Sequence, residues 1–160
     1  MVRKLIAGLA VLLLASGAAA YWTWRGRATA QTAAGDRQAA VSAAGTYAVN
    51  LLSVSHRTVD EDLRRILDTS TGEARTENVR SAAAVKSATV KTKAVETGVL
   101  RSAAIDSMNG SSADVLVVAD AVIRWEGDKK LAPEERFYRW RMRVAKVGGV
   151  WLVAKAEMVS

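Results

Sequence analysis

Few side chains in this 160-residue sequence could perform acid–base or nucleophilic chemistry. It holds one histidine, His56, and no cysteine. The lack of cysteine excludes disulfides, Cys-based zinc sites, iron–sulfur clusters and a thiol nucleophile. A hydrolytic triad needs a base, and we expect His56 to be a solvent-exposed loop residue just before a helix. No glycine-rich phosphate-binding motif occurs. We therefore expect no enzyme activity, no catalytic residues, no metal and no cofactor.

Three aspartates near or within the first two predicted strands could form a carboxylate pair for acid–base catalysis. They are Asp106, Asp114 and Asp120. Asp120 interrupts the apolar run LVVADAVI, which makes it the strongest candidate. The interpretation we favour is structural, with an aspartate paired to an arginine of the same sheet.

Arginines alternate along the third predicted strand, so they share one of its faces. They are Arg139, Arg141 and Arg143. Guanidinium groups bind carboxylates and phosphates in bidentate fashion, so the row could contact an anion or a protein partner. The alternative, which we favour, is a solvated sheet face with Asp and Glu partners.

The formal net charge of +7 arises from 23 basic and 16 acidic side chains. Residues 1–27 contribute +4, from Arg3, Lys4, Arg25 and Arg27 without any acid, and the remainder contributes only +3. A domain so nearly balanced is a poor candidate for binding nucleic acid, and we expect none as a partner.

Residues 5–24 form an uncharged, mostly apolar run. About 20 such residues suffice for a helix to cross a bilayer, and aromatic rings favour the headgroup layer. Residues 1–27 are therefore predicted to be a membrane anchor, although a signal peptide cleaved near Ala18–Ala20 is an alternative. The flanking charges predict a single-pass protein with a cytoplasmic N-terminus and an extracytoplasmic domain. The anchoring residues are Arg3, Lys4, Tyr21, Trp22, Trp24, Arg25 and Arg27.

Helices are predicted for the next part of the chain. Residues 28–55 have the spacing of an amphipathic helix or stalk, with Val41, Ala44 and Leu51 on its apolar stripe. Capping boxes, in which a hydroxyl and a carboxylate bind free amides, are expected at Thr58–Glu61 and Ser70–Glu73. The second would open a helix over roughly residues 72–90.

After about residue 94 the hydrophobic period changes to two. Four strand-like runs follow, and Asn109-Gly110 and Gly148-Gly149 supply two-residue turns. The second turn predicts that Trp140 lies opposite Glu157, Met142 opposite Lys155, Arg141 opposite Ala156 and Arg143 opposite Ala154. Residues 56–160 thus form an α+β domain of two or three helices on a four-stranded antiparallel sheet.

Several stretches resemble the Mce-associated membrane proteins, accessory proteins of actinobacterial mammalian-cell-entry (Mce) lipid transporters. The stretches are YAVNLLSVSHRTVDEDLRRILDTSTGEARTENV, VETGVLRSAAIDSMNGSSADVLVVADAVI and FYRWRMRVAKVGGVWLVAKAEMV. That family has a membrane helix, a helix resembling Y-A-x-x-L-x-S, a T-x-D-x-D-L helix start, a T-G junction and a G-x-W-L-V strand. The last corresponds to Gly149, Trp151, Leu152 and Val153.

The resemblance implies a fold similar to nuclear transport factor 2, a cone of helices wrapped by a curved sheet. The implied fold is also similar to that of the periplasmic domain of a type IV secretion inner-membrane component. The implied function is a non-catalytic accessory subunit of an Mce-type ABC lipid importer in the cell envelope, with its permease and lipid-binding subunits as partners. Two alternatives are an envelope scaffold or secretion-type assembly factor and, less favoured, a cone-fold isomerase or cyclase.

Overall fold

The computed structural model of the chain describes residues 31–127 and 131–159. The predicted membrane anchor, residues 1–27, lies outside these ranges, and no helix within them is long and apolar enough to span a bilayer. The chain divides into two compact units, Met1–Asp36 and Arg37–Ser160.

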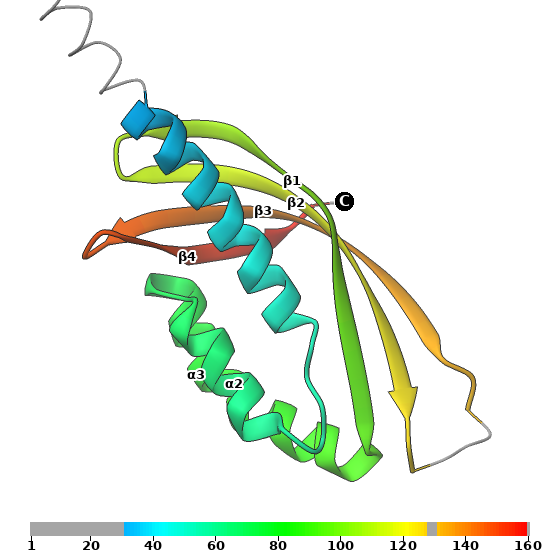
Figure 1. The fold of residues 1–160 in the computed structure, drawn as a ribbon. Helices are drawn as coiled ribbons and strands as arrows, with labels where there is room; N and C mark the ends of the chain where they lie inside the picture. The colour runs from blue at the N-terminus through cyan, green and yellow to red at the C-terminus, as the bar shows by residue number, and fades with distance from the viewer. Residues whose placement is uncertain (1–30, 128–130, 160) are drawn as a thin grey trace, which may run out of the picture. The chain divides into compact units, whose positions relative to one another are not determined.

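In the described part of the chain, three helices precede four strands. Residues 31–51 are helical, and the part from residue 37 onward is called the N-terminal helix here. The other elements are α2 (Val59–Asp68), α3 (Gly72–Thr92), β1 (Ala94–Asn109), β2 (Ser112–Trp125), β3 (Glu134–Val147) and β4 (Val150–Met158). The strands form one antiparallel sheet in the order β1-β2-β3-β4. The predicted α+β class, with helices first and an antiparallel meander after them, is confirmed (Figure 1).

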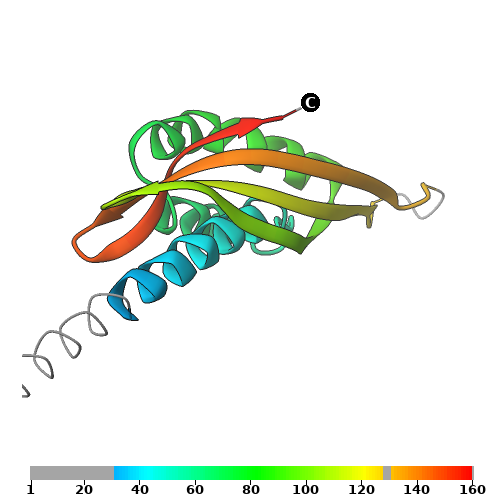
Figure 2. The same ribbon diagram turned by 90° about the horizontal axis from the view of Figure 1, so that it is seen from above.

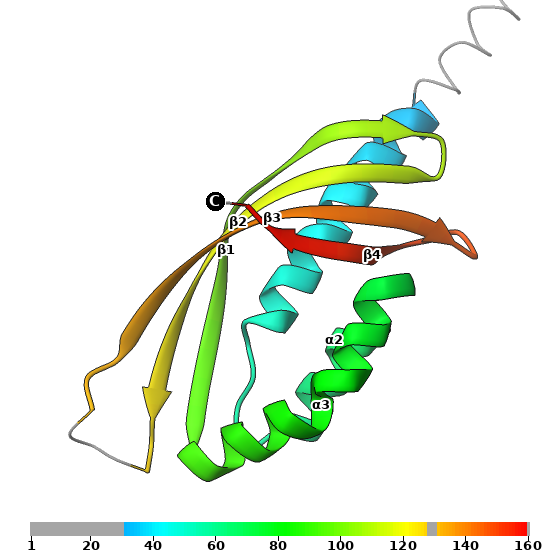
Figure 3. The ribbon, with the colours of Figure 1, turned by 180° about the vertical axis from the view of Figure 1, so that it is seen from behind.

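The sheet is strongly bent, and the helices lie on its concave side (Figures 1 and 3). Seen from above, the N-terminal helix and α3 project past opposite edges of the sheet, with α3 next to β4 (Figure 2). Alternate residues of each strand point to the same face, so one face of β2 and β3 supplies the core. Its fully buried members include Val115, Val117, Met142 and Val144, together with Val153 of β4.

The N-terminal helix contributes small side chains to this core. Ala40, Ala44 and Ala48 are fully buried, and Tyr47 is nearly so. An alanine face lets the helix axis approach the sheet closely. The predicted apolar stripe is therefore correct at Ala44, which is buried. At Val41 and Leu51, the ends of the predicted stripe, the side chains are only half-buried.

Both predicted capping boxes are wrong in detail. Helix α2 does start after Thr58, but the Thr58 hydroxyl donates to Asp62 Oδ2 (2.9 Å) instead of accepting from an amide. Helix α3 starts at Gly72, and its cap is Thr71, not Ser70. The Ser70 hydroxyl donates to the carbonyl oxygen of Leu67. Nearby side-chain and carbonyl acceptors thus take the hydroxyl protons at both helix starts.

The predicted pairing of β3 with β4 is right next to the turn and wrong beyond it. Val144 lies opposite Val153, as a two-residue turn at Gly148-Gly149 requires. An irregularity between Arg143 and Val144 then shifts the register by one residue, so that Trp140 lies opposite Met158. Arg141, Met142 and Arg143 accordingly lie opposite Glu157, Ala156 and Lys155. A bulge adds one residue to one strand, and no feature of the sequence indicates its position.

The edge strand β1 has two irregularities of the same kind. They lie between Leu100 and Ser102 and between Ile105 and Ser107. The start of β1 is covered by the segment that follows the N-terminal helix, because Glu96 donates its amide to the carbonyl of Val54 and Ser55 bridges to Val95.

Gly98 of β1 marks the closest approach between the sheet and the end of the N-terminal helix. A Cβ atom there would lie 2.6 Å from Leu52 Cβ and 3.2 Å from the Leu52 carbonyl carbon and oxygen. We predict that Gly98→Ala lowers the free energy of unfolding by about 1–3 kcal/mol, the usual range for overpacking. Gly35→Ala is the control, because that helical position is open and exposed. Thermal unfolding of both variants checks this, and equal midpoints would contradict it.

Candidate functional site

The three aspartates singled out in the sequence are all paired with arginines. Asp120 Oδ2 lies 2.5 Å from Arg101 Nε, and Asp114 Oδ1 lies 2.9 Å from Arg143 Nε. Asp106 Oδ2 lies 3.5 Å from Arg141. These contacts agree with the structural interpretation that we favoured for them. The partner of Asp120, Arg101, was not foreseen, because it lies at the first irregularity of β1.

The arginine row occupies the outer face of the sheet, away from the helices. Trp140 and Met142, which alternate with the arginines, are buried on the concave side. Arg141 and Arg143 carry the ion pairs described above, whereas Arg139 has no ion-pair partner among the residues that the structure describes. Beside it, Phe137 is 71% exposed. The expectation of acidic partners thus holds for two of the three arginines.

The concave side of the sheet is closed by packed side chains. Tyr47 lies against this core, and Asn78 Nδ2 of α3 donates to its hydroxyl oxygen (3.0 Å). Burial raises the pKa of Tyr47, and the hydrogen bond with Asn78 partly offsets this effect. A crevice of about 200 Å³ remains between the N-terminal helix and α3 and reaches Trp140.

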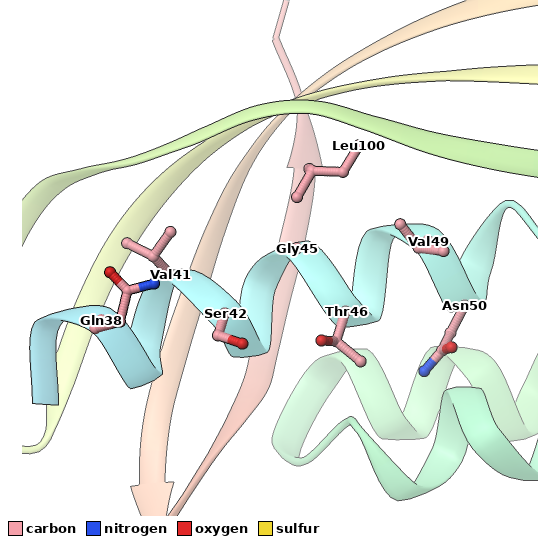
Figure 4. Close-up of a pocket in the computed structure, with 8 residues that line it drawn as sticks. All are labelled: Gln38, Val41, Ser42, Gly45, Thr46, Val49, Asn50 and Leu100. Atoms are coloured by element: carbon pink, nitrogen blue, oxygen red, sulfur yellow. The ribbon is translucent and has the colours of Figure 1, made fainter. Parts of the chain in front are cut away.

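A groove of about 430 Å³ runs between the N-terminal helix and β1 (Figure 4). Figure 4 shows Leu100 of β1 reaching over Gly45, where a Cβ would come within 2.7 Å of Leu100 Cδ2. Glycine at this position therefore lets the strand side chain form one wall. We call it the helix groove, and it is lined by Gln38, Val41, Ser42, Gly45, Thr46, Val49, Asn50 and Leu100.

A second groove, of about 460 Å³, lies on the other side of the same helix. Ser42 and Thr46 line both grooves, so the exposed face of the helix is a ridge between two hollows. The second groove also includes Val150, Trp151 and Leu152 of β4. Another helix or a loop can pack into grooves that lie on either side of such a ridge of small side chains.

A further hollow, of about 640 Å³ and thus larger than either groove, lies where β2 ends and β1 begins. We call it the basic cleft. The segment before α2, the end of α3, the end of β2 and residues 131–133 all contribute to it. Its lining residues are His56, Arg57, Lys93, Arg124, Trp125, Glu126, Leu131 and Pro133. Four distant parts of the chain supply them, so no local motif could have revealed the cleft.

His56 is not the exposed loop residue that the sequence suggested. Its side chain is only 19% exposed, and its Nε2 lies 2.7 Å from Glu126 Oε2. Arg57 makes a second contact of 2.7 Å with the same carboxylate oxygen. The hydrogen bond with His56, followed by the charge of Arg57, lowers the pKa of Glu126.

Asp62 holds the segment that carries His56 and Arg57. It is only 2% exposed, and its Oδ2 accepts from the Ser55 amide (2.8 Å) and the Thr58 hydroxyl. Its Oδ1 accepts from Arg65 (2.6 Å).

Within the described residues, no cluster of His, Asp and Glu could hold a metal ion.

Removing the Asp62 carboxylate should loosen this segment. We predict that Asp62→Ala lowers the free energy of unfolding by about 1.5–3 kcal/mol, the range for hydrogen bonds to a charged group, because the half-buried Ser55 amide and the Thr58 hydroxyl lose their acceptor. Asp60→Ala on the same helix turn should cost no more than about 1 kcal/mol, since its contact with Lys86 is exposed. Denaturant unfolding of the two variants provides the comparison. A smaller loss for Asp62→Ala than for Asp60→Ala would show that Asp62 does not organise the segment.

The outer face offers a test by pH titration. The hydrogen bond from Arg143 is the main cause that lowers the pKa of Asp114. This pair therefore stabilises the fold above the pKa of an unfolded aspartate, and the contribution is lost as the pH falls through the lowered value. We predict that Arg143→Gln raises the pKa of Asp114 toward its ordinary value, as measured by carboxyl-carbon NMR. Arg139→Gln should leave it unchanged, and an equal rise in both variants would refute the assignment.

Solved structures of similar fold come from proteins of several kinds. The periplasmic domain of DotI superposes with a TM-score of 0.60 at 13% identity, covering 74% of this chain and 91% of that one. VirB8 of Agrobacterium tumefaciens gives 0.60 at 10% identity, with 78% and 92% covered. A putative scytalone dehydratase of Novosphingobium aromaticivorans gives 0.57 at 12% identity, with 81% and 86% covered. The cone-shaped fold inferred from the sequence is thereby confirmed, and at such identities the likeness concerns the fold alone.

Sequence comparison extends over almost the whole chain. A protein of Mycobacterium tuberculosis described as "Uncharacterized protein Rv1363c" is 30% identical over 146 residues. These cover 90% of this chain and 54% of the relative, so the chain spans about half the length of the curated relative it matches. Residues 2–160 match the family described as "Uncharacterized protein Rv1363c/MT1408-like". The chain therefore belongs to the Rv1363c/MT1408-like family.

Proposed function

We propose that this chain is a non-catalytic, membrane-anchored subunit of the cell envelope that binds other proteins through its folded domain. The observation that supports this most is the position of the open hollows. Helices and packed side chains cover the concave face of the sheet, while both grooves beside the N-terminal helix lie on the outside. External grooves beside a helix suit contact with a partner protein.

The similar structures favour an assembly role. Among them are VirB8 and the periplasmic domain of DotI, and a VirB8 homologue and an IcmL-like protein are described as parts of type IV secretion systems. The same fold also serves a dehydratase, so fold similarity by itself does not assign a function. An envelope assembly domain fits both the fold and the predicted anchor, which would leave the domain on the extracytoplasmic side.

Our finer proposal is that the partners belong to an Mce-type ABC lipid importer. Its support is the order of the sequence stretches that resemble Mce-associated membrane proteins, from Tyr47 to Val159. In this proposal residues 1–27 lie in the bilayer, and the domain stabilises the permease or the lipid-binding subunits. The alternative is an envelope scaffold that acts by self-association.

Site-specific crosslinking of the full chain in its own membrane tests these proposals. We predict that a photo-crosslinking amino acid at Ser42, which lines both grooves, forms adducts with permease or Mce lipid-binding subunits. Placed at Ser87, an exposed position of α3 outside both grooves, it should form few. Adducts are identified by mass spectrometry after affinity purification.

Each other outcome has a definite meaning. Adducts of Ser42 with a second copy of the chain alone would replace the transporter proposal by the scaffold. Equal adducts from Ser42 and Ser87 would remove the grooves as the contact surface. If no transporter subunit copurifies with the tagged chain, the Mce proposal fails.

A further inference from the structure

The basic cleft has no part in the proposed assembly role, and it differs chemically from the grooves. Arg57, Lys93 and Arg124 bring three positive charges to its lining, against the single negative charge of Glu126. Glu126 is already engaged by His56 and Arg57. Neither Lys93 nor Arg124 has an ion-pair partner within residues 31–127 and 131–159. Among the described lining residues, positive charges therefore outnumber negative ones.

Backbone contacts fix the positions from which these side chains extend. His56 donates its amide to the carbonyl of Ala94 (2.9 Å), and Glu126 donates its amide to the carbonyl of Lys93 (3.0 Å). The segment before α2, the start of β1 and the end of β2 are thus joined at the cleft. Groups that are held before a ligand arrives bind it with a smaller loss of conformational entropy.

Lys93 has an unusual backbone conformation for its residue type. It ends α3 with φ = 50° and ψ = 41°, and it is the one non-glycine residue with positive φ in the described part of the chain. Glycine or asparagine is usual at such a helix end, and other residues adopt it at a cost of about 1–2 kcal/mol. A lysine kept there places a positive charge at the cleft despite that cost, and such exceptions cluster at functional sites.

The remaining lining is apolar and partly aromatic. Trp125, the last residue of β2, lines the same hollow as Arg124, and so do Leu131 and Pro133. The volume of about 640 Å³ falls within the range of small-molecule sites. An aromatic ring and aliphatic groups next to cations suit a ligand with an anionic group attached to an apolar or ring-shaped body.

We propose that the basic cleft binds an organic anion, a phosphate or carboxylate carried on an apolar or aromatic body. Arg124 and Lys93 contact the anionic group, and Trp125 contacts the body. The ligand belongs either to the soluble phase or to a lipid headgroup, which share this chemistry. This inference does not depend on the proposed transporter partners.

Calorimetric titration of the full chain in detergent micelles tests it, with phenyl phosphate as the probe. Inorganic phosphate lacks the body and phenol lacks the charge, so both should bind more weakly. We predict that Arg124→Gln and Lys93→Asn each weaken phenyl phosphate binding about tenfold, the effect of losing one charge-assisted hydrogen bond. Asparagine accepts left-handed backbone, so Lys93→Asn removes the charge without a new conformational cost.

Two matched controls remove a positive charge elsewhere. Lys91→Asn lies two residues before Lys93 on α3, and Arg139→Gln lies on the outer face of the sheet. Both should leave the affinity unchanged. Fluorine NMR of 5-fluorotryptophan protein, with Trp125→Phe to assign the signal, should show that the probe shifts Trp125 and not Trp140 or Trp151.

The proposal is overturned if phenyl phosphate shows no saturable binding, if control and cleft variants lose affinity equally, or if the Trp125 signal does not move. The source of the anion is distinguished by dihexanoyl phosphatidic acid, a short-chain lipid. Tighter binding than phenyl phosphate assigns the cleft to a lipid headgroup, and weaker binding assigns it to a soluble anion.

Discussion

The rest of the structure depends on the burial of one face of a bent antiparallel sheet. Its valines, together with Met142 and Trp140, need an apolar cover, and the N-terminal helix supplies much of it with Ala40, Ala44 and Ala48. Burial of apolar area is the main favourable contribution to folding, and small side chains bring the helix close enough to achieve it. The same closeness requires glycine at position 98, against Leu52 Cβ and the Leu52 carbonyl, and Gly45 leaves room for the Leu100 side chain. Because the inner face is used for packing, the open grooves of this unit border the outside of the helix.

Element types and their order could be predicted from the sequence because they follow from hydrophobic period and turn chemistry. A period of two after residue 94 and the two glycine turns suffice for the meander. The bulge next to Arg143 could not be foreseen, since nothing in the local residue types requires it, and it changed four predicted pairs. The helix caps failed for a related reason. Competing acceptors, Asp62 for Thr58 and the Leu67 carbonyl for Ser70, become visible only in three dimensions.

Among the candidate sites, too, some could be predicted from the sequence and others could not. Pairing of the strand aspartates with arginines of the sheet could be expected, as for Asp114, which lies opposite Arg143 on the neighbouring strand. The particular partner of Asp120 could not, because Arg101 lies at an irregularity of β1. The basic cleft could not, because Arg57, Lys93 and Arg124 meet only after folding. By contrast, the residues that match the sequence pattern of Mce-associated membrane proteins mostly have structural roles. Tyr47 is buried against Asn78, Asp62 organises the segment before α2, and Trp151 is a core residue. That sequence pattern therefore accounts for the fold, because its residues build the core. It gives less information about a function.

The two irregularities of β1 have a consequence for how copies of this domain can meet. An edge strand with a regular row of free amides and carbonyls is a template for pairing with another chain, and bulges are one way in which proteins prevent this. In β1 the breaks at Leu100/Ser102 and Ile105/Ser107 divide the row into short pieces. Open-ended stacking of domains, edge to edge, is disfavoured in this way. Contacts between copies of the domain are thereby limited to those that side-chain surfaces specify.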